Sequence, residues 1–322
     1  MTMVVTTFAT RVLGAVTRAA LVLAPLLASL WAAAPQPIFR AETDVVSFGV
    51  TVTDRRGNFI TDLTDEDFEI LEDGRAQTLA YFARGDRAEG TPVMHVGLLF
   101  DTSGSMTQDI QLARSAAIRF LNTLREARDI TLVDFDTEIR LAKYEQQDFP
   151  RLVERIRGRT PQGLTAMYDA LGLYLDGADR DEGRTILVIF TDGGDTRSML
   201  RFSDAMTLIR ASDVTAYAVG FLEHQRTGDR FQQRLQLSQL AAESGGEAFF
   251  PLSMKEIDAA YDKILAQIRA QYSLGFVSSN PARDGAWRKV EIRVRRPDLR
   301  DLRVQTRKGY FAPYRPLGPD QQ

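Results

Sequence analysis

The sequence predicts an α/β fold in which a doubly wound, mostly parallel sheet is inserted in a β-sandwich formed by the N- and C-terminal segments. In the middle of the chain, short apolar runs alternate with helical patterns, as expected for a parallel sheet covered by helices. Strand patterns precede and follow this middle part, and each end supplies about three strands. Because neither end can bury a sheet alone, one shared sandwich is the economical arrangement.

The first part of the chain, residues 1–34, has the features of a signal peptide or an N-terminal anchor. Arg11 and Arg18 precede an apolar stretch from Ala19 to Ala34, and no acidic residue occurs before Glu42. A basic start followed by an apolar region and small residues is typical of secretory signal peptides. An uncleaved anchor is the alternative, although the apolar run is short against the roughly 20 residues that span a bilayer. We therefore expect an exported protein, periplasmic or secreted, or one anchored to the inner membrane by this segment.

Residues 35–90 form the N-terminal half of the predicted sandwich. Val45–Thr53 alternates enough to be a strand. Farther along, Phe68–Leu71 and Ala76–Phe82 flank an Asp73-Gly74 pair, which is a hairpin signal. The segment is therefore rich in strands and too short to fold independently.

Residues 91–270 form the predicted doubly wound domain. Its strands lack a clean alternation of apolar and polar residues, which fits strands covered on both faces. The expected strands are Val96–Phe100, Ile130–Phe135, Thr185–Phe190 and Val214–Val219. The expected helices are Ile110–Leu124, Ala166–Leu175, Ser203–Ile209, Phe231–Glu243 and Met254–Ala270. Strands and helices that alternate in this way indicate a parallel sheet with helices on both faces.

Residues 271–322 return to strand patterns and supply the other half of the sandwich. In the clearest strand, Val290, Ile292 and Val294 lie on one face and charged residues on the other. The expected strands are Tyr272–Val277, Trp287–Val294 and Leu302–Tyr310.

Oxygen-bearing side chains follow the predicted strands of the middle domain. Asp101, Ser103 and Ser105 come directly after one apolar run, Asp192 follows another, and Thr165 precedes a helix. In open α/β sheets, ligands bind outside the carboxyl ends of the strands, so we expect these residues to meet there. Carboxylates and hydroxyls are hard ligands that suit Mg²⁺ or Mn²⁺ rather than zinc. Since Mg²⁺ takes about six oxygens, at least one position remains for a partner.

These five residues resemble the metal-ion-dependent adhesion site (MIDAS) of von Willebrand factor A (VWA) domains, whose pattern is DxSxS, then a Thr, then an Asp. The flanking sequences DLTDEDFEILEDGRAQTLAYF and YSLGF, with WRKVEIRVRR and VQTRKGYF, are similar to bacterial secreted VWFA-related proteins. The resemblance covers nearly the whole chain after residue 34. It implies that a protein partner offers an Asp or Glu carboxylate to the metal.

Each polar residue also has a plainer interpretation. Asp101 and Asp192 fit turns or helix caps, and Thr165 could cap the helix that follows it. The five residues in register favour the metal site over these separate roles. The other carboxylates nearby, Asp134, Asp136 and Asp195, are expected to be solvated on strands or turns, and Asp195 could also support the metal site from outside the ligand shell.

Several function classes lack their chemistry in this chain. The formal charge of −3 argues against a nucleic-acid partner, and the absence of cysteine excludes a thiol nucleophile or a cysteine zinc site. The two histidines, His95 and His224, are expected in the core and in a solvated loop respectively. No Walker A loop, dinucleotide-binding glycine pattern or HExxH occurs.

The sequence therefore predicts divalent-cation-dependent binding of a protein, of the adhesion or assembly type, and no enzymatic activity. A membrane is expected as a partner only if the N-terminal segment is uncleaved. Two alternatives remain open. One is an Mg²⁺-dependent hydrolase of phosphoesters, for which no general base is evident. The other is a structural envelope-assembly module in which the metal stabilises the fold.

Overall fold

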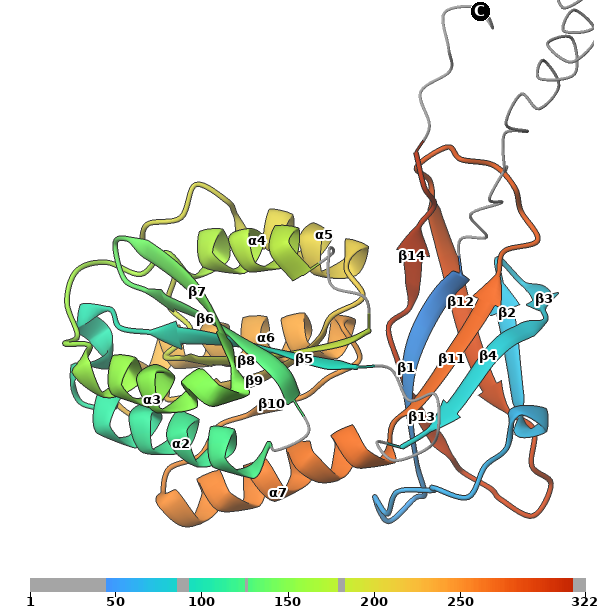
Figure 1. Cartoon of the computed structure of the whole chain (residues 1–322), viewed down its shortest axis with the longest axis horizontal. Helices are drawn as coiled ribbons and strands as arrows, with labels where there is room; N and C mark the ends of the chain where they lie inside the picture. Colours follow the sequence, from blue (N-terminus) through green and yellow to red (C-terminus); the bar gives the residue numbers. More distant parts are fainter. Residues whose placement is uncertain (1–44, 86–92, 125–126, 179–182, 315–322) are drawn as a thin grey trace, which may run out of the picture. The chain divides into compact units, whose positions relative to one another are not determined.

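The computed structural model describes residues 45–85, 93–124, 127–178 and 183–314 (Figure 1). The expected export segment, residues 1–34, lies outside the described residues. Within the described ranges, no helix has both the length and the apolar content needed to cross a bilayer.

The middle of the chain forms one six-stranded sheet. Its strands lie in the order β10 (Ala248–Phe249), β9 (Thr215–Gly220), β8 (Arg184–Thr191), β5 (Met94–Asp101), β6 (Ala127–Phe135) and β7 (Ile139–Glu145). All neighbours run parallel except β6 and β7, which are antiparallel. The central strand β5 is buried along its whole length, which explains why its sequence is apolar without alternation. The predicted doubly wound sheet is confirmed.

Helices cover both faces of this sheet. The cluster of buried side chains on one face includes residues from α2 (Ile110–Thr123), α3 (Phe149–Gly158) and α7 (Met254–Ala270). The cluster on the other face includes residues from α4 (Met167–Ala178), α5 (Phe202–Ala211) and α6 (Thr227–Glu243). Figure 1 shows these helices on the two sides of the sheet. The apolar stripes of the helices therefore pack where their spacing predicts.

The register of the parallel strands sets the position of the candidate site. Phe100 of β5 pairs with Phe190 of β8, and Asp101 pairs with Phe135 of β6. Thr191 of β8 lies opposite Gly220 of β9. The four strands therefore end at the same edge, and the loops that follow them meet there.

The two ends of the chain share one β-sandwich. Its first sheet has the order β13 (Arg303–Gln305), β1 (Val45–Thr53), β11 (Tyr272–Val277) and β4 (Leu79–Arg84). Its second sheet has the order β14 (Gly309–Phe311), β12 (Trp287–Val294), β2 (Phe68–Glu72) and β3 (Arg75–Gln77). The first sheet alternates strands from the two ends of the chain, and in the second sheet β12 from the C-terminal end pairs with β2 from the N-terminal end. Their inner side chains form one core, in which Phe48 stacks on Phe276 with ring centroids 6.1 Å apart. The predicted sandwich is confirmed.

Some elements differ from the sequence prediction. The segment predicted as one strand from Ala76 to Phe82 is divided into β3 and β4, which belong to different sheets, and Leu302–Tyr310 is divided into β13 and β14 in the same way. The chain crosses between the sheets at these points, a long-range choice that local alternation does not encode. The hairpin is confirmed, because Glu72 pairs with Arg75 across Asp73 and Gly74, which both have positive φ.

Candidate metal centre

Asp101 and Asp192 meet at the carboxyl edge of the sheet. Asp101 ends β5 and Asp192 directly follows β8, and both residues have no exposed surface. The hydroxyl of Thr191 donates a hydrogen bond of 2.6 Å to Oδ2 of Asp101. This bond joins the ends of two neighbouring strands beside the two carboxylates.

The loop after β5 turns two hydroxyls toward each other. The backbone N–H of Ser103 donates to Oδ1 of Asp101 at 2.9 Å, which closes a tight turn. The Oγ atoms of Ser103 and Ser105 are 3.0 Å apart. The N–H of Gly104 donates to the carbonyl of Gly163 at 3.1 Å, so this loop also contacts the segment that carries Thr165.

Thr165 is held by its backbone, while its hydroxyl has no hydrogen-bond partner in the described ranges. Its N–H donates to Oγ1 of Thr196 at 3.0 Å, and its carbonyl accepts from the N–H of Thr196 at 2.9 Å. The first N–H groups of α4 donate elsewhere: Tyr168 to Asp195 and Asp169 to Ser198. The interpretation of Thr165 as a helix cap is therefore wrong, because other side chains perform that role.

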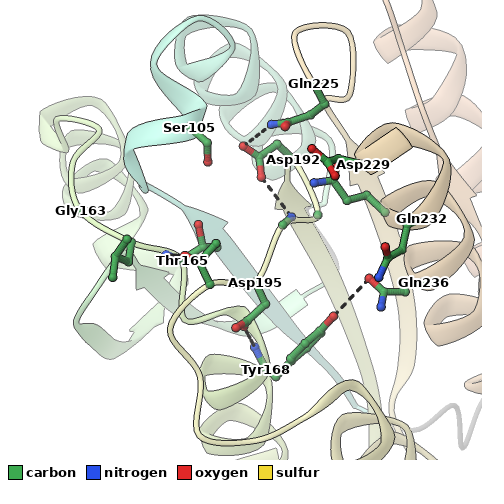
Figure 2. A pocket seen from close by; sticks show the side chains of 15 residues that line it. Ser105, Gly163, Thr165, Tyr168, Asp192, Asp195, Gln225, Asp229, Gln232 and Gln236 are labelled. Carbon is green, nitrogen blue, oxygen red and sulfur yellow. Dashed lines mark hydrogen bonds between the residues drawn. The ribbon is translucent and has the colours of Figure 1, made fainter. Parts of the chain in front are cut away.

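A pocket of about 520 Å³ opens over these residues (Figure 2). Ser105, Thr165 and Asp192 line it, whereas Asp101 and Ser103 are fully buried behind it. Figure 2 shows Ser105, Thr165 and Asp192 at one end of the pocket. All five residues singled out in the sequence therefore belong to one locality at the carboxyl edge of the sheet.

Burial makes the negative charge here unfavourable. Burial, and then the charge of Asp192, raises the pKa of Asp101 from 3.8 to about 7. Burial also raises the pKa of Asp192, a hydrogen bond from Ser105 opposes this rise, and the charge of Asp109 adds to it. Among the described residues, no Lys, Arg or His forms an ion pair with either carboxylate. Buried charges are normally paired, bound to a metal or neutralised by a proton, so these two carboxylates would gain from either a cation or a proton.

The donor set fits a hard divalent cation. Two carboxylates and three hydroxyls offer only oxygen, as Mg²⁺ and Mn²⁺ prefer. In the described part of the chain, no group of three or more His, Cys, Asp or Glu side chains is placed to hold a metal, which leaves this mixed set of carboxylates and hydroxyls as the candidate. When bound, the cation would supply positive charge next to the two carboxylates and an open position facing the pocket.

A group of residues beside this centre was not predicted from the sequence. Asp109, at the N-cap of α2, makes no capping hydrogen bond and is only 5% exposed. Its carboxylate lies 3.0 Å from Nδ1 of His224, which is exposed in its loop as expected but has this one contact. Gln225 donates from Nε2 to Oδ2 of Asp192 at 2.9 Å. Residues 224 and 225 follow β9, and the rule that ligand sites form at carboxyl strand ends was the available signal for this loop.

The other carboxylates singled out in the sequence are not simply solvated. Asp134 is fully buried, and it accepts hydrogen bonds from Nε of Arg140 at 2.8 Å and from Nε of Arg155 at 2.6 Å. Asp136 is 4% exposed and accepts from Nη2 of Arg140 at 2.7 Å. Solvation was therefore the wrong expectation for both, because arginines from later segments reach them.

Asp195 and His95 have structural contacts. Asp195 accepts from the N–H of Tyr168 at 2.9 Å and from the hydroxyl of Ser198 at 2.6 Å, which fixes the start of α4 behind Thr165. His95 is buried, as expected, with Nδ1 3.0 Å from Oδ1 of Asp129.

The fold and the site define an α/β domain with a candidate cation centre at the carboxyl edge of its sheet. Residues 95–263, more than half of the chain, match the family model of the von Willebrand factor type A domain. The chain belongs to this family. No curated protein matches the sequence.

Solved structures with similar folds have low identity to this chain. The vWF domain of the type V pili tip protein Mfa5 from Porphyromonas gingivalis is 13% identical with a TM-score of 0.45, and the match covers 55% of this chain and 97% of that one. A von Willebrand factor type A protein from Catenulispora acidiphila is 13% identical with a TM-score of 0.46, over 86% and 75% of the two chains. The pilus adhesin SpaC from Lactobacillus rhamnosus GG is 10% identical with a TM-score of 0.47, over 77% of this chain and 48% of that one.

Proposed function

We propose that this protein binds another protein through a divalent cation, Mg²⁺ or Mn²⁺. Five residues would hold the cation as a MIDAS: Asp101, Ser103, Ser105, Thr165 and Asp192. The observation that best supports the proposal is the pair of buried carboxylates, Asp101 and Asp192, which lack a basic partner among the described residues and lie beneath an open pocket. A carboxylate from an Asp or Glu of the partner would take the open position on the cation.

The chain's own residues would prepare this site without rearrangement. Thr191 and the N–H of Ser103 hold the Asp101 carboxylate, and the Thr196 hydroxyl holds the backbone of Thr165. Such fixed contacts reduce the entropy lost on binding. The partner's carboxylate would be attracted by a cation that is only partly hydrated, so affinity would depend on that one acid.

The proposal treats the site as a binding site and not as a catalytic one. A hydrolase would need a general base near the cation. The pocket lining contains no His, Lys or Cys, and His224 is directed to Asp109 rather than lining the pocket. Of the other carboxylates in the lining, Asp195 is hydrogen-bonded to Tyr168 and Ser198, and Asp229 lies on α6 rather than beside Asp101. A screen of phosphoester substrates with and without Mg²⁺ tests this directly: hydrolysis that depends on Mg²⁺ and on Asp192 would favour the enzyme.

The localisation belongs to the same proposal. We expect export to the periplasm or the cell exterior, with the N-terminal segment either cleaved or retained as an anchor. Its basic and apolar regions in the sequence support this part of the proposal.

The test is capture of a partner from the native envelope fraction in Mg²⁺ and in EDTA. Wild-type protein should retain one or more proteins in Mg²⁺ and release them in EDTA, and Asp192→Ala should retain none. Asp262→Asn is the matched control, because it removes an exposed charge on α7, the helix on the opposite face of the sheet from α4. If Asp192→Ala lowers stability but leaves capture intact, the metal is structural and the binding proposal is wrong.

A further inference from the structure

The pocket extends beyond the candidate metal centre to helix α6. Asp229, Gln232, Gln233 and Gln236 line this second half. Their spacing places them on one face of the helix. Figure 2 shows Asp229, Gln232 and Gln236 along one side of the pocket, with Gly163 and Thr165 on the other. The cation ligands and the α6 side chains therefore face the same space from different elements.

This half of the pocket carries negative charge and no positive charge. No Lys, Arg or His lines the pocket, whereas Asp192, Asp195 and Asp229 do. Asp192 belongs to the candidate metal centre, and Asp195 accepts hydrogen bonds from Tyr168 and Ser198. The Asp229 side chain is exposed, and no hydrogen bond or ion pair engages it within the described ranges. Its place in the first turn of α6 suits the helix dipole but leaves its carboxylate free for a ligand.

Gln233 adds an unused acceptor at the same place. Its Oε1 is buried and has no hydrogen-bond donor in the described ranges. The side chain packs over Gly193 and Gly194, and a Cβ at Gly194 would lie 3.0 Å from Nε2 of Gln233, so a side chain there would crowd it. Gln236 already accepts from the Tyr168 hydroxyl at 3.4 Å. A buried acceptor without a donor costs free energy, so Oε1 of Gln233 would gain from a hydrogen-bond donor on a ligand in this pocket.

We propose that the α6 half of the pocket is a subsite for a basic side chain of the partner, arginine in preference to lysine. A guanidinium carries a positive charge and five N–H donors in a planar fork, so it can pair with Asp229 and also donate to Gln233. An ammonium offers one compact charge and matches two separated acceptors less well. Because this half adjoins the metal centre, the basic residue would lie close in sequence to the partner's acid. The expected proximity of the basic residue to the partner's acid rests on the proposed function, whereas the subsite itself does not.

The subsite is tested with argininamide, which has the guanidinium and no carboxylate. Argininamide is titrated into the full chain while the side-chain amide signals of Gln232, Gln233 and Gln236 are followed by NMR. Saturable shifts are expected in EDTA and equally in Mg²⁺, with weaker binding of lysinamide. Asp229→Asn should weaken argininamide binding about threefold to fivefold, as for an exposed ion pair. Glu223→Gln removes the same charge from an exposed residue that does not line the pocket, and should bind normally.

Each other outcome overturns the inference. No shift of the glutamine signals, or an equal response in Asp229→Asn, removes the subsite. Binding that disappears in Mg²⁺ places the guanidinium at Asp101 and Asp192 instead. Both variants are checked for unchanged thermal unfolding, so that a folding defect is recognised, and Gln233→Met, which removes the acceptor at similar size, gives a second variant that should also bind argininamide more weakly.

A peptide library with a fixed aspartate and random neighbours tests the link to the metal centre. Selection on Mg²⁺-loaded wild type and on Glu223→Gln should enrich arginine near the aspartate, and selection on Asp229→Asn should enrich it clearly less. If no Mg²⁺-dependent peptides emerge, the proposed function is contradicted, and the argininamide titration alone decides the subsite. If Mg²⁺-dependent peptides emerge without arginine enrichment, the proposed function stands and the inference fails.

Discussion

The hydroxyl of Thr191 donates to Oδ2 of Asp101 at 2.6 Å and accepts from the N–H of Gly193 at 2.9 Å. One side chain thus ties the end of β8 to the end of β5 and also fixes the turn after Asp192. The two carboxylates are held by covalent neighbours and hydrogen bonds, although their charges repel. The fold therefore holds two buried carboxylates close together although their repulsion and burial cost free energy. A bound cation would offset that cost.

The first prediction concerns pH and stability without metal. Burial and the charge of Asp192 raise the pKa of Asp101 from 3.8 to about 7. Between these values the folded state holds a proton that the unfolded state releases. The contribution of Asp101 to the free energy of unfolding in EDTA should therefore fall as pH rises from about 4 to about 7, by at most about 1.4 kcal/mol per pH unit. Thermal unfolding across this range measures the effect.

Mg²⁺ should remove much of this pH dependence, since the cation replaces the proton. The difference in Tm between Mg²⁺ and EDTA should then grow with pH. Asp101→Asn is the control and should flatten the profile in EDTA. A profile in EDTA that is the same for wild type and Asp101→Asn would show that Asp101 does not titrate in this range.

The second prediction concerns the affinity for metal. Asp101→Ala and Asp192→Ala should each weaken Mg²⁺ or Mn²⁺ binding by more than about tenfold, since substitutions outside the ligands commonly cost that much. Calorimetry on the purified chain measures the dissociation constants, with Asp262→Asn as the charge-matched control. Unchanged affinity for the metal in both alanine variants would contradict the proposed metal centre.

The third prediction concerns the buried ion pairs at the end of β6. Asp134 accepts from Arg140 and Arg155, and Nε of Arg159 lies 2.9 Å from its Oδ2. Asp134→Ala leaves these arginines without their shared anion, so the free energy of unfolding should fall by about 3–5 kcal/mol. Urea unfolding measures the loss. Asp148→Ala, which removes a half-buried carboxylate paired with the exposed Arg151, should cost less than about 1 kcal/mol and serves as the control.

The fourth prediction concerns the shared sandwich. β11 lies between β1 and β4, and β12 lies between β14 and β2. Removing residues 272–322 therefore takes the central partner from one sheet and an inner strand from the other, and exposes Phe48 and Ile70. We expect rapid proteolysis between residues 45 and 85, while residues 91–270 remain folded by circular dichroism. A fragment of residues 35–90 that unfolds cooperatively on its own would contradict the prediction.

The sequence was sufficient for the architecture because the two hydrophobic periods differ so clearly along the chain. β5 has an apolar run, Val96–Phe100, without alternation, whereas β12 alternates, and each pattern specifies how many faces are buried. The division of β3 from β4 was not predictable in the same way. Their assignment to different sheets depends on β2 and β11, which lie far from one another in sequence.

The site residues were predictable because Asp101, Ser103 and Ser105 are adjacent in sequence and follow a strand. Asp109 and Gln225 were missed because no pattern joins them: they come from the start of α2 and from the loop after β9, and only the fold brings them to Asp192. The burial of Asp134 was missed for the same reason, since its arginine partners lie on β7 and α3.

The last prediction separates binding of the partner from binding of the metal. The Thr165 hydroxyl is neutral and has no hydrogen-bond partner in the described part of the chain, while its backbone is bonded to Thr196. Thr165→Ala should therefore leave the fold intact and lower the affinity for the metal only slightly, because the charge of both carboxylates remains. It should weaken partner capture more, because the oxygens around the open position change.

Thr165→Ser keeps a hydroxyl at this position and should capture the partner as wild type does. Capture by wild type, Thr165→Ala, Thr165→Ser and EDTA-treated protein is compared, with circular dichroism as the folding control. Equal capture by all four would show that the partner does not bind through this site.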